Sequence, residues 1–65
     1  MTIGTKLKQF RVDNQLSQEQ FAEIAGMTRA SVQAIETERN ENPTLENVNA
    51  IASAMGMTID ELIAD

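Results

Sequence analysis

The 65-residue sequence predicts an all-α fold of five short helices. Three observations support this fold class. Apolar residues recur three or four positions apart along most of the chain, which is the helical period and not the alternation of a strand. A Ser or Thr precedes each of these stretches, where it can cap a helix, and Gly26 and Gly56 follow two of them. The chain has the length of one small domain and no repeat or linker, so we expect residues 1–65 to form a single domain.

The first helix is expected from about residue 3 to Asn14. Ile3, Leu7 and Phe10 recur at helical spacing and define its apolar face. Thr2 precedes them as a candidate cap, and the polar residues that follow the helix end the pattern.

The second helix begins at a capping box. The Ser17 hydroxyl can accept a hydrogen bond from a backbone N–H of the first turn, while the Gln20 side chain reaches back to the backbone of Ser17. Gly26 then provides a left-handed end to the helix. The residues expected on its apolar face are Phe21, Ala22, Ile24 and Ala25.

A third helix follows after almost no connecting chain. Thr28 is expected to cap a helix from Arg29 to Glu36, with Val32 and Ile35 pointing inward. A helix of about nine residues is marginal by itself, so the second and third helices must stabilise each other by packing. Two short helices joined by a sharp bend form a helix-turn-helix, whose second helix enters the major groove of DNA.

Two more helices follow a polar loop from Thr37 to Pro43. Thr44 is expected to cap the fourth helix and Gly56 to end it, and a second capping box from Thr58 to Glu61 opens a short fifth helix. The inner stripe of the fourth helix is expected to contain Leu45, Val48, Ile51, Ala52 and Met55. The apolar residues of the fifth are Ile59, Leu62 and Ile63.

Composition excludes several classes of function. The chain contains no cysteine and no histidine, which excludes disulfides and the usual zinc sites and favours a reducing cytoplasm. No apolar run approaches the ~20 residues of a membrane span. There is also no glycine-rich phosphate loop and no pair of carboxylates that the helical pattern places in a pocket. We therefore expect no enzyme activity, no cofactor, no metal and no small-molecule ligand.

Charge is distributed unevenly along the chain. Five basic and ten acidic residues give a net charge of −5, which is the wrong sign for a phosphate-rich partner. However, all five basic residues lie within residues 1–40, where five acidic residues balance them, and the other five acidic residues lie within residues 41–65. We expect the acidic part of the chain to face away from any nucleic acid.

The residues in these elements also match a known family pattern. The matching residues and segments are Phe21, Ala22, Ala25, Gly26, Met27, Val32, Ile35, Glu36, Asn42–Leu45, Ile51–Gly56 and Ile59–Leu62. Their joint spacing resembles that of the Cro/CI-type (XRE-family) helix-turn-helix repressors, including phage repressors and SinR-type regulators. The resemblance covers nearly the whole chain and implies a compact, five-helix, lambda-repressor-like DNA-binding domain.

The third helix is expected to read bases with its outward face, through Arg29, Ala30, Gln33 and Ala34. Arginine suits the O6 and N7 atoms of guanine, and glutamine suits the N6 and N7 atoms of adenine. The alternative is that Gln33 is simply solvated and that Arg29 is a general phosphate contact. The resemblance assigns Gln18 to a phosphate. The full set of phosphate candidates is Gln18, Thr28, Ser31, Thr37, Arg39, Asn40 and Asn42.

The resemblance also implies a structural ion pair and weaker binding to the DNA backbone. Arg11 and Glu36 match positions that form a largely buried ion pair, which would fasten the first helix to the end of the third. Relatives commonly place glycine where this chain has Glu38, followed by basic residues of which only Arg39 is retained. We therefore expect a reduced grip on the DNA backbone.

The predicted function is that of a sequence-specific DNA-binding transcriptional regulator, and specifically a repressor. A homodimer is expected on a pseudo-palindromic operator, because one helix reads only a few base pairs. Met57, Ile59 and Ile63 are the candidate dimer surface, or they simply complete the core. The alternative is a protein-interaction module on the same fold, which binds a repressor, toxin or polymerase. The net charge and the acidic loop favour this alternative, whereas the neutral DNA-facing half of the chain and the pair Arg29 and Gln33 oppose it.

Overall fold

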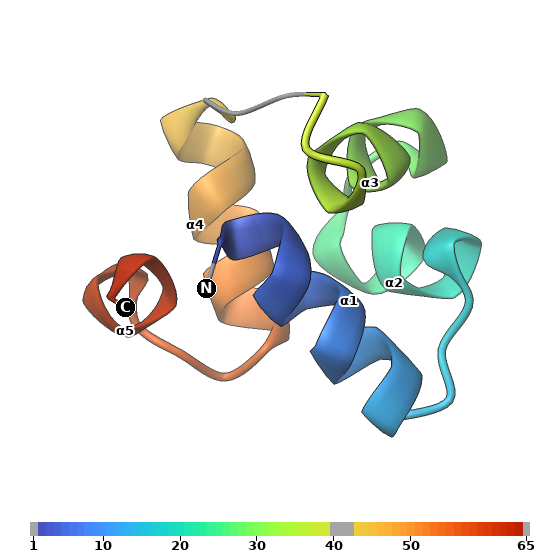
Figure 1. Cartoon of the computed structure of the whole chain (residues 1–65), viewed down its shortest axis with the longest axis horizontal. Coiled ribbons are helices and arrows are strands. Elements are labelled where there is room, and N and C mark those ends of the chain that lie inside the picture. Colours follow the sequence, from blue (N-terminus) through green and yellow to red (C-terminus); the bar gives the residue numbers. More distant parts are fainter. Residues whose placement is uncertain (1, 40–42, 65) are drawn as a thin grey trace.

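The computed structural model describes residues 2–39 and 43–64. These residues form five helices and no strand (Figure 1), which confirms the predicted all-α class. The helices are α1 (Ile3–Asp13), α2 (Gln18–Ala25), α3 (Arg29–Glu36), α4 (Leu45–Ala54) and α5 (Ile59–Ile63). None of them has the length and apolar composition that crossing a bilayer requires.

Each helix begins at the Ser or Thr that the sequence predicts. The side-chain oxygen of each cap accepts a hydrogen bond from the backbone N–H three residues further on, at 3.0–3.1 Å. The five caps are Thr2, Ser17, Thr28, Thr44 and Thr58. Complete capping boxes are present at Ser17 and Thr58. A cap of this kind stabilises a helix by about 1 kcal/mol, so the starts of the helices are determined locally.

Left-handed residues follow the ends of four helices. Gly26 and Gly56, the two predicted stops, have φ angles of 71° and 68°. Gln15 and Glu38 occupy the same region, at 57° and 62°, after α1 and α3. A Cβ atom in this conformation costs roughly 1–2 kcal/mol, so these two residues carry backbone strain that the glycines avoid.

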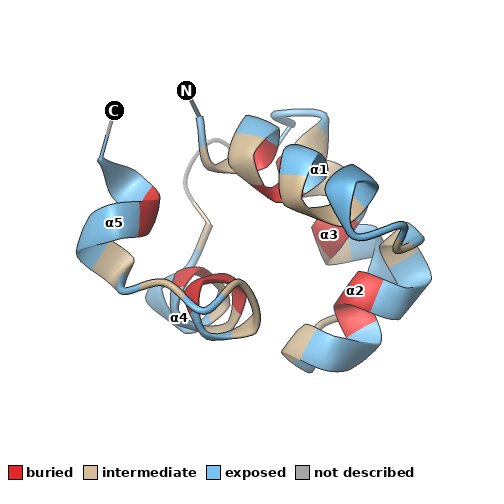
Figure 2. Ribbon diagram, turned by 90° about the horizontal axis from the view of Figure 1, so that it is seen from below, coloured by how far each residue is buried: buried red, intermediate tan, exposed pale blue. Residues whose placement is uncertain are grey.

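The core receives side chains from all five helices. Its buried members are Leu7, Phe21, Ala22, Val32, Ile35, Val48, Ile51, Ala52 and Leu62. Figure 2 colours the buried parts of the chain red, and these lie mainly on the sides of the helices that face one another. The rings of Phe10 and Phe21 meet edge to face with centroids 6.1 Å apart. Burial of each large apolar side chain contributes about 1.5–3 kcal/mol, which makes this core the main attraction between the helices.

Two residues predicted to face inward are exposed. Ile24 is 60% exposed and Leu45 is 73% exposed. The inward row of α2 passes through Phe21, Ala22 and Ala25, and Ile24 lies to one side of that row. Leu45 is the first residue of α4, and its side chain points away from the core that Val48 in the same turn enters. The prediction was therefore wrong for both residues, because spacing alone does not say where neighbouring helices lie.

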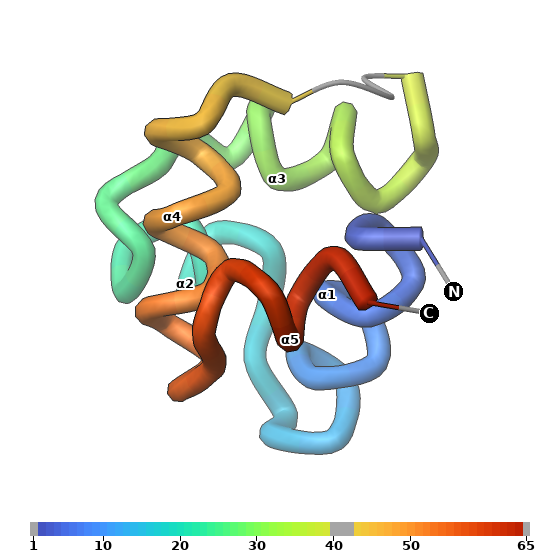
Figure 3. The backbone as a smooth tube through the Cα atoms, turned by 90° about the vertical axis from the view of Figure 1, so that its left-hand side faces the viewer, coloured from blue at the N-terminus to red at the C-terminus, as the bar shows by residue number. Residues whose placement is uncertain are grey.

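The position of α1 depends on two contacts that the sequence did not indicate. At Gly4, an added Cβ would lie 2.1 Å from the backbone carbonyl oxygen of Ile35, so only glycine permits this approach of α1 to α3. The Lys6 Nζ donates to the Leu62 carbonyl at 2.9 Å and to the Ala64 carbonyl at the end of α5. Figure 3 shows the beginning of α1 and the end of α5 side by side.

Candidate nucleic-acid interface on the third helix

The turn between α2 and α3 is short and closed by hydrogen bonds. The Met27 N–H donates to the Ala22 carbonyl at 2.8 Å, across the left-handed Gly26. Thr28 then caps α3. Ala22 itself is 3% exposed, and its small side chain lets the two helices approach closely. These features hold α3 in one orientation relative to α2.

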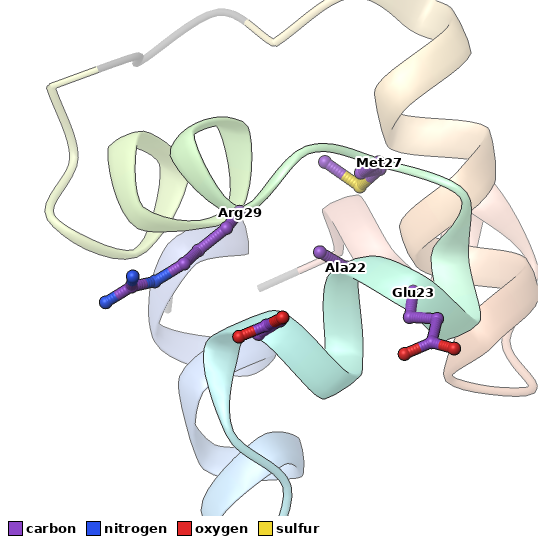
Figure 4. A pocket seen from close by; sticks show the side chains of 5 residues that line it. Ala22, Glu23, Met27 and Arg29 are labelled. Carbon is purple, nitrogen blue, oxygen red and sulfur yellow. The ribbon is translucent and has the colours of Figure 1, made fainter.

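One side of α3 is buried and the opposite side is open. Val32 and Ile35 belong to the core, whereas Arg29, Ala30 and Gln33 are exposed. Of the base-reading candidates, only Ala34 is half-buried. The exposed row is therefore neither covered nor part of the core. Figure 4 shows the Arg29 side chain extending away from Ala22 and Met27.

A hollow of about 510 Å³ lies beside Arg29, at the junction of α2 and the turn. Its lining includes Glu19 and Glu23 from α2 as well as Met27. Within residues 2–39 and 43–64, Arg29 forms no ion pair with either carboxylate. Arg29 thus lines a hollow that also contains two carboxylates, and it is paired with neither of them.

Several phosphate candidates already have partners within the chain. The Thr28 hydroxyl donates to the Ser31 hydroxyl oxygen at 2.8 Å. The Thr37 hydroxyl donates to the Gln33 carbonyl at 2.8 Å. The hydroxyl protons of Thr28 and Thr37 are therefore used internally, whereas the Ser31 hydroxyl is the acceptor in its contact with Thr28. Local capping and helix-end geometry therefore account for much of what these side chains do in this structure.

Arg11 and Glu36 form a bidentate ion pair between α1 and the end of α3. The Arg11 Nε lies 2.7 Å from Glu36 Oε2, and Nη2 lies 3.0 Å from Oε1. The Arg11 Nη1 also donates to the Leu16 carbonyl at 3.0 Å, before α2 begins. The two side chains are 15% and 3% exposed, so the pair is largely buried, as the resemblance implied.

Gln18 joins this pair through its side-chain amide. Its Nε2 donates to Glu36 Oε1 at 3.2 Å. Burial alone raises the pKa of Glu36, but hydrogen bonds from Arg11 and Gln18 outweigh burial and hold that pKa below its ordinary value. The hydrogen bond to Glu36 in turn raises the pKa of Arg11. The sequence offered no signal for the Gln18–Glu36 contact, which joins residues 18 positions apart.

The segment after α3 is not the run of basic residues that would bind a DNA phosphate. Glu38 is left-handed, and its Oε1 accepts a hydrogen bond from the Thr2 hydroxyl at 2.7 Å. This contact holds the Glu38 carboxylate against the start of α1. Arg39 is exposed. Asn40 and Asn42, the remaining phosphate candidates, lie outside the described residues.

The candidate dimer residues are not equivalent. Met57 and Ile59 are half-buried and pack against the core. Ile63 is 56% exposed, although its neighbour Leu62 is fully buried. Ile63 is therefore the member of this group that offers most apolar surface.

The chain is similar in sequence to known proteins. The helix-turn-helix family model (HTH_3) matches residues 7–62. The chain is 34% identical over all 65 residues to the immunity repressor protein of Bacillus phage phi105 and spans 44% of its length. It is 31% identical over 61 residues, or 94% of its length, to the control protein C.SmaI of Serratia marcescens, and it spans 71% of that protein.

A solved structure supports the fold independently. The P22 c2 repressor, crystallised with a synthetic operator, has a TM-score of 0.84 and 21% identity, and the match covers 97% of this chain and 94% of that one. The agreement confirms the lambda-repressor-like arrangement of the five described helices. The family model covers most of the chain and both relatives are named as regulators. We conclude that this chain belongs to the XRE-type helix-turn-helix family.

Proposed function

We propose that this chain is a sequence-specific DNA-binding transcriptional regulator, which represses by occupying its operator. The observation that carries the proposal is the exposed row of Arg29, Ala30 and Gln33 on a helix whose opposite side is locked in the core. A phage immunity repressor as a relative, and a repressor–operator complex as a structural neighbour, support it. The protein then acts where DNA is, inside the cell, as a regulator and not as a catalyst.

In this proposal α3 lies in the major groove. Arg29 and Gln33 are four residues apart and therefore stacked on one face of the helix. Arg29 donates two hydrogen bonds to guanine, and Gln33 pairs with adenine, each contact discriminating by about 1–3 kcal/mol. Ala30 packs against a thymine methyl, with half-buried Ala34 at the margin of the contact.

The start of α2 provides a complementary phosphate contact. The first four backbone N–H groups of a helix have no partner within the helix. The capping box satisfies those of Ser17 and Gln20, which leaves the N–H groups of Gln18 and Glu19 directed out of the helix end. Such groups favour an anion, and the Gln18 side chain lies beside them.

A homodimer is the proposed state on DNA, with half-sites about 34 Å apart or a multiple of that distance. The exposed Ile63, flanked by Met57 and Ile59, is the proposed contact between the protomers. A two-fold dimer uses the same surface patch on both copies. Ile63 of each protomer would therefore contribute to the apolar contact near the two-fold axis.

Selection of bound sequences from a random duplex pool tests the proposal. The expected result is a pseudo-palindrome whose half-sites contain a guanine that Arg29→Ala no longer selects. Lys8→Ala is the matched control, because it removes the same charge from an exposed position on α1. If both variants select the same operator as the unchanged protein, the assignment of α3 is wrong.

The acidic hollow lined by Glu19 and Glu23, together with the net charge of −5, favours the protein-interaction alternative. A titration with random duplex at low salt separates the two functions. With DNA as the partner, log K should fall with log salt by about 0.9 per neutralised phosphate, and the slope should be shallow because few basic residues are available. No binding by the folded protein, even at low salt, would overturn the DNA-binding proposal and favour the alternative.

A further inference from the structure

We propose that Glu36 is a positioning residue for DNA binding. Through its hydrogen bond to Gln18, it orients the amide that meets a phosphate at the start of α2. The inference rests on the proposed function, since it explains how one of the proposed phosphate contacts is prepared. The Arg11–Glu36 ion pair then has a second role besides fastening α1 to α3.

The geometry around Glu36 leaves its carboxylate little freedom. Glu36 is the last residue of α3 and its side chain is 3% exposed. Arg11 binds both oxygens, at 2.7 and 3.0 Å, in the bidentate arrangement that fixes the plane of a carboxylate. Oε1 accepts from Gln18 Nε2 at 3.2 Å as well. The direction of the Gln18 amide is therefore set by groups on α1 and α3.

The contact leaves Gln18 with hydrogen-bonding capacity for a ligand. A side-chain amide has two N–H hydrogens, and only one of them can point to Glu36. Within the described part of the chain, the Gln18 side chain makes no other hydrogen bond. Its second N–H is thus available beside the backbone N–H groups of the first turn of α2. Because the amide is held in advance, binding does not have to order a side chain with many rotamers.

The charge of the groups makes the inference testable. Gln18 is neutral, so its hydrogen bond to a phosphate releases no counterion and leaves the salt slope of binding unchanged. Direct neutralisation of a phosphate by Arg11 would instead contribute to that slope. The dependence of affinity on salt therefore separates positioning by the pair from direct contact by Arg11.

A double-mutant cycle on the full chain provides the test. The paired variant Arg11→Met with Glu36→Leu replaces the ion pair by apolar side chains, a change that commonly preserves stability. It is combined with Gln18→Ala, and Gln9→Ala is the control at an exposed position on α1. Thermal unfolding first establishes that each variant folds, and fluorescence anisotropy then measures binding to a short random duplex at several salt concentrations.

Gln18→Ala should weaken binding about tenfold in the unchanged protein and much less in the paired variant. The paired variant should itself bind more weakly, with an unchanged salt slope, and Gln9→Ala should have no effect. The proposal is overturned if Gln18→Ala has the same effect in both backgrounds. A slope that falls by about 0.9 in the paired variant also overturns it, because Arg11 is then the phosphate contact.

A measurement without DNA keeps this inference separate from the proposed function. In nuclear magnetic resonance spectra of the free protein, the side-chain amide of Gln18 should differ from that of exposed Gln9 in shift and hydrogen exchange. The paired variant should remove the difference. Identical Gln18 signals in both proteins overturn the positioning role even if DNA binds. Expected signals without any DNA binding overturn the proposed function itself, and with it the phosphate role of Gln18.

Discussion

The first three helices and the last two are held together by different kinds of contact. In α1–α3, polar contacts join residues far apart in sequence, such as Arg11 with Glu36 and Thr2 with Glu38. In the described part of α4 and α5, the polar side-chain contacts are local caps apart from the bonds that Lys6 donates, and Val48, Ile51, Ala52 and Leu62 supply the packing. Lys6 is the bridge between the two parts.

The two kinds of contact have different effects: apolar burial keeps helices together, whereas polar contacts fix their orientation. Apolar burial holds α4 and α5 on the domain but tolerates small shifts, because the hydrophobic effect has no direction. Bidentate and backbone contacts specify angles and distances, and they concentrate where α3 must be held for its proposed role. We therefore expect polar substitutions to cost more in the first region than in the second, and the following predictions test that expectation.

The largest contrast is expected between Glu36→Ala and Glu61→Ala. The first leaves the largely buried Arg11 without its partner and should lower the free energy of unfolding by about 3–5 kcal/mol. The second removes an exposed capping side chain and should lower it much less. Urea unfolding followed by circular dichroism measures both. Equal losses would show that the two regions do not differ in this way.

Gly4→Ala is expected to cost about 3 kcal/mol, because its Cβ would overlap the Ile35 backbone and push α1 away from α3. Gly56→Ala is the comparison, with the same atoms added in the second region. Among the described residues, no atom outside Gly56 and its two chain neighbours lies within 4 Å of such a Cβ, so only left-handed strain of about 1 kcal/mol remains. Thermal unfolding measures both. A larger loss for Gly56→Ala would contradict the close approach at Gly4.

Acid should remove more stability through Glu36 in the first region than through Glu61 in the second. The pKa of Glu36 is below its ordinary value in the folded state, so its stabilising effect is present above the unfolded pKa of about 4.3 and is lost as pH falls through the folded value. Glu61 is shifted in the same direction by its backbone hydrogen bond with Thr58, but it is exposed. The free energy of unfolding should be measured from pH 7 to pH 3 in both variants. Its dependence on pH should decrease more in Glu36→Gln than in Glu61→Gln.

The smallest effect is expected at the left-handed residues. Glu38→Gly removes both backbone strain and a negative charge close to α3, and should raise affinity for random duplex about twofold to fivefold per protomer. Gln15→Gly makes the same backbone change at a neutral residue after α1. Filter binding at low salt compares them. If Gln15→Gly raises affinity equally, the charge of Glu38 is not responsible.

The bounds of the helices follow from the sequence because they depend on near neighbours. Each predicted cap contacts the backbone three residues further on, and Gly26 and Gly56 adopt the predicted left-handed conformation. The direction of α3 was also predictable, because Val32 and Ile35 define its buried side and leave Arg29 and Gln33 outside. These features require no knowledge of how the helices pack.

Tertiary structure alone decided the remaining features, since each depends on a distant partner. Ile24 and Leu45 match the apolar spacing of their helices, yet both side chains are mostly exposed. In the sequence, Gly4 looks like any glycine within a helix. Its requirement for a missing Cβ becomes visible only when the Ile35 backbone packs against it. Gln18 meets Glu36 only after α2 and α3 have packed at their observed angle. Periodicity and capping are local properties of a chain, whereas exposure, close approach and long-range hydrogen bonds are set by the relative placement of its helices.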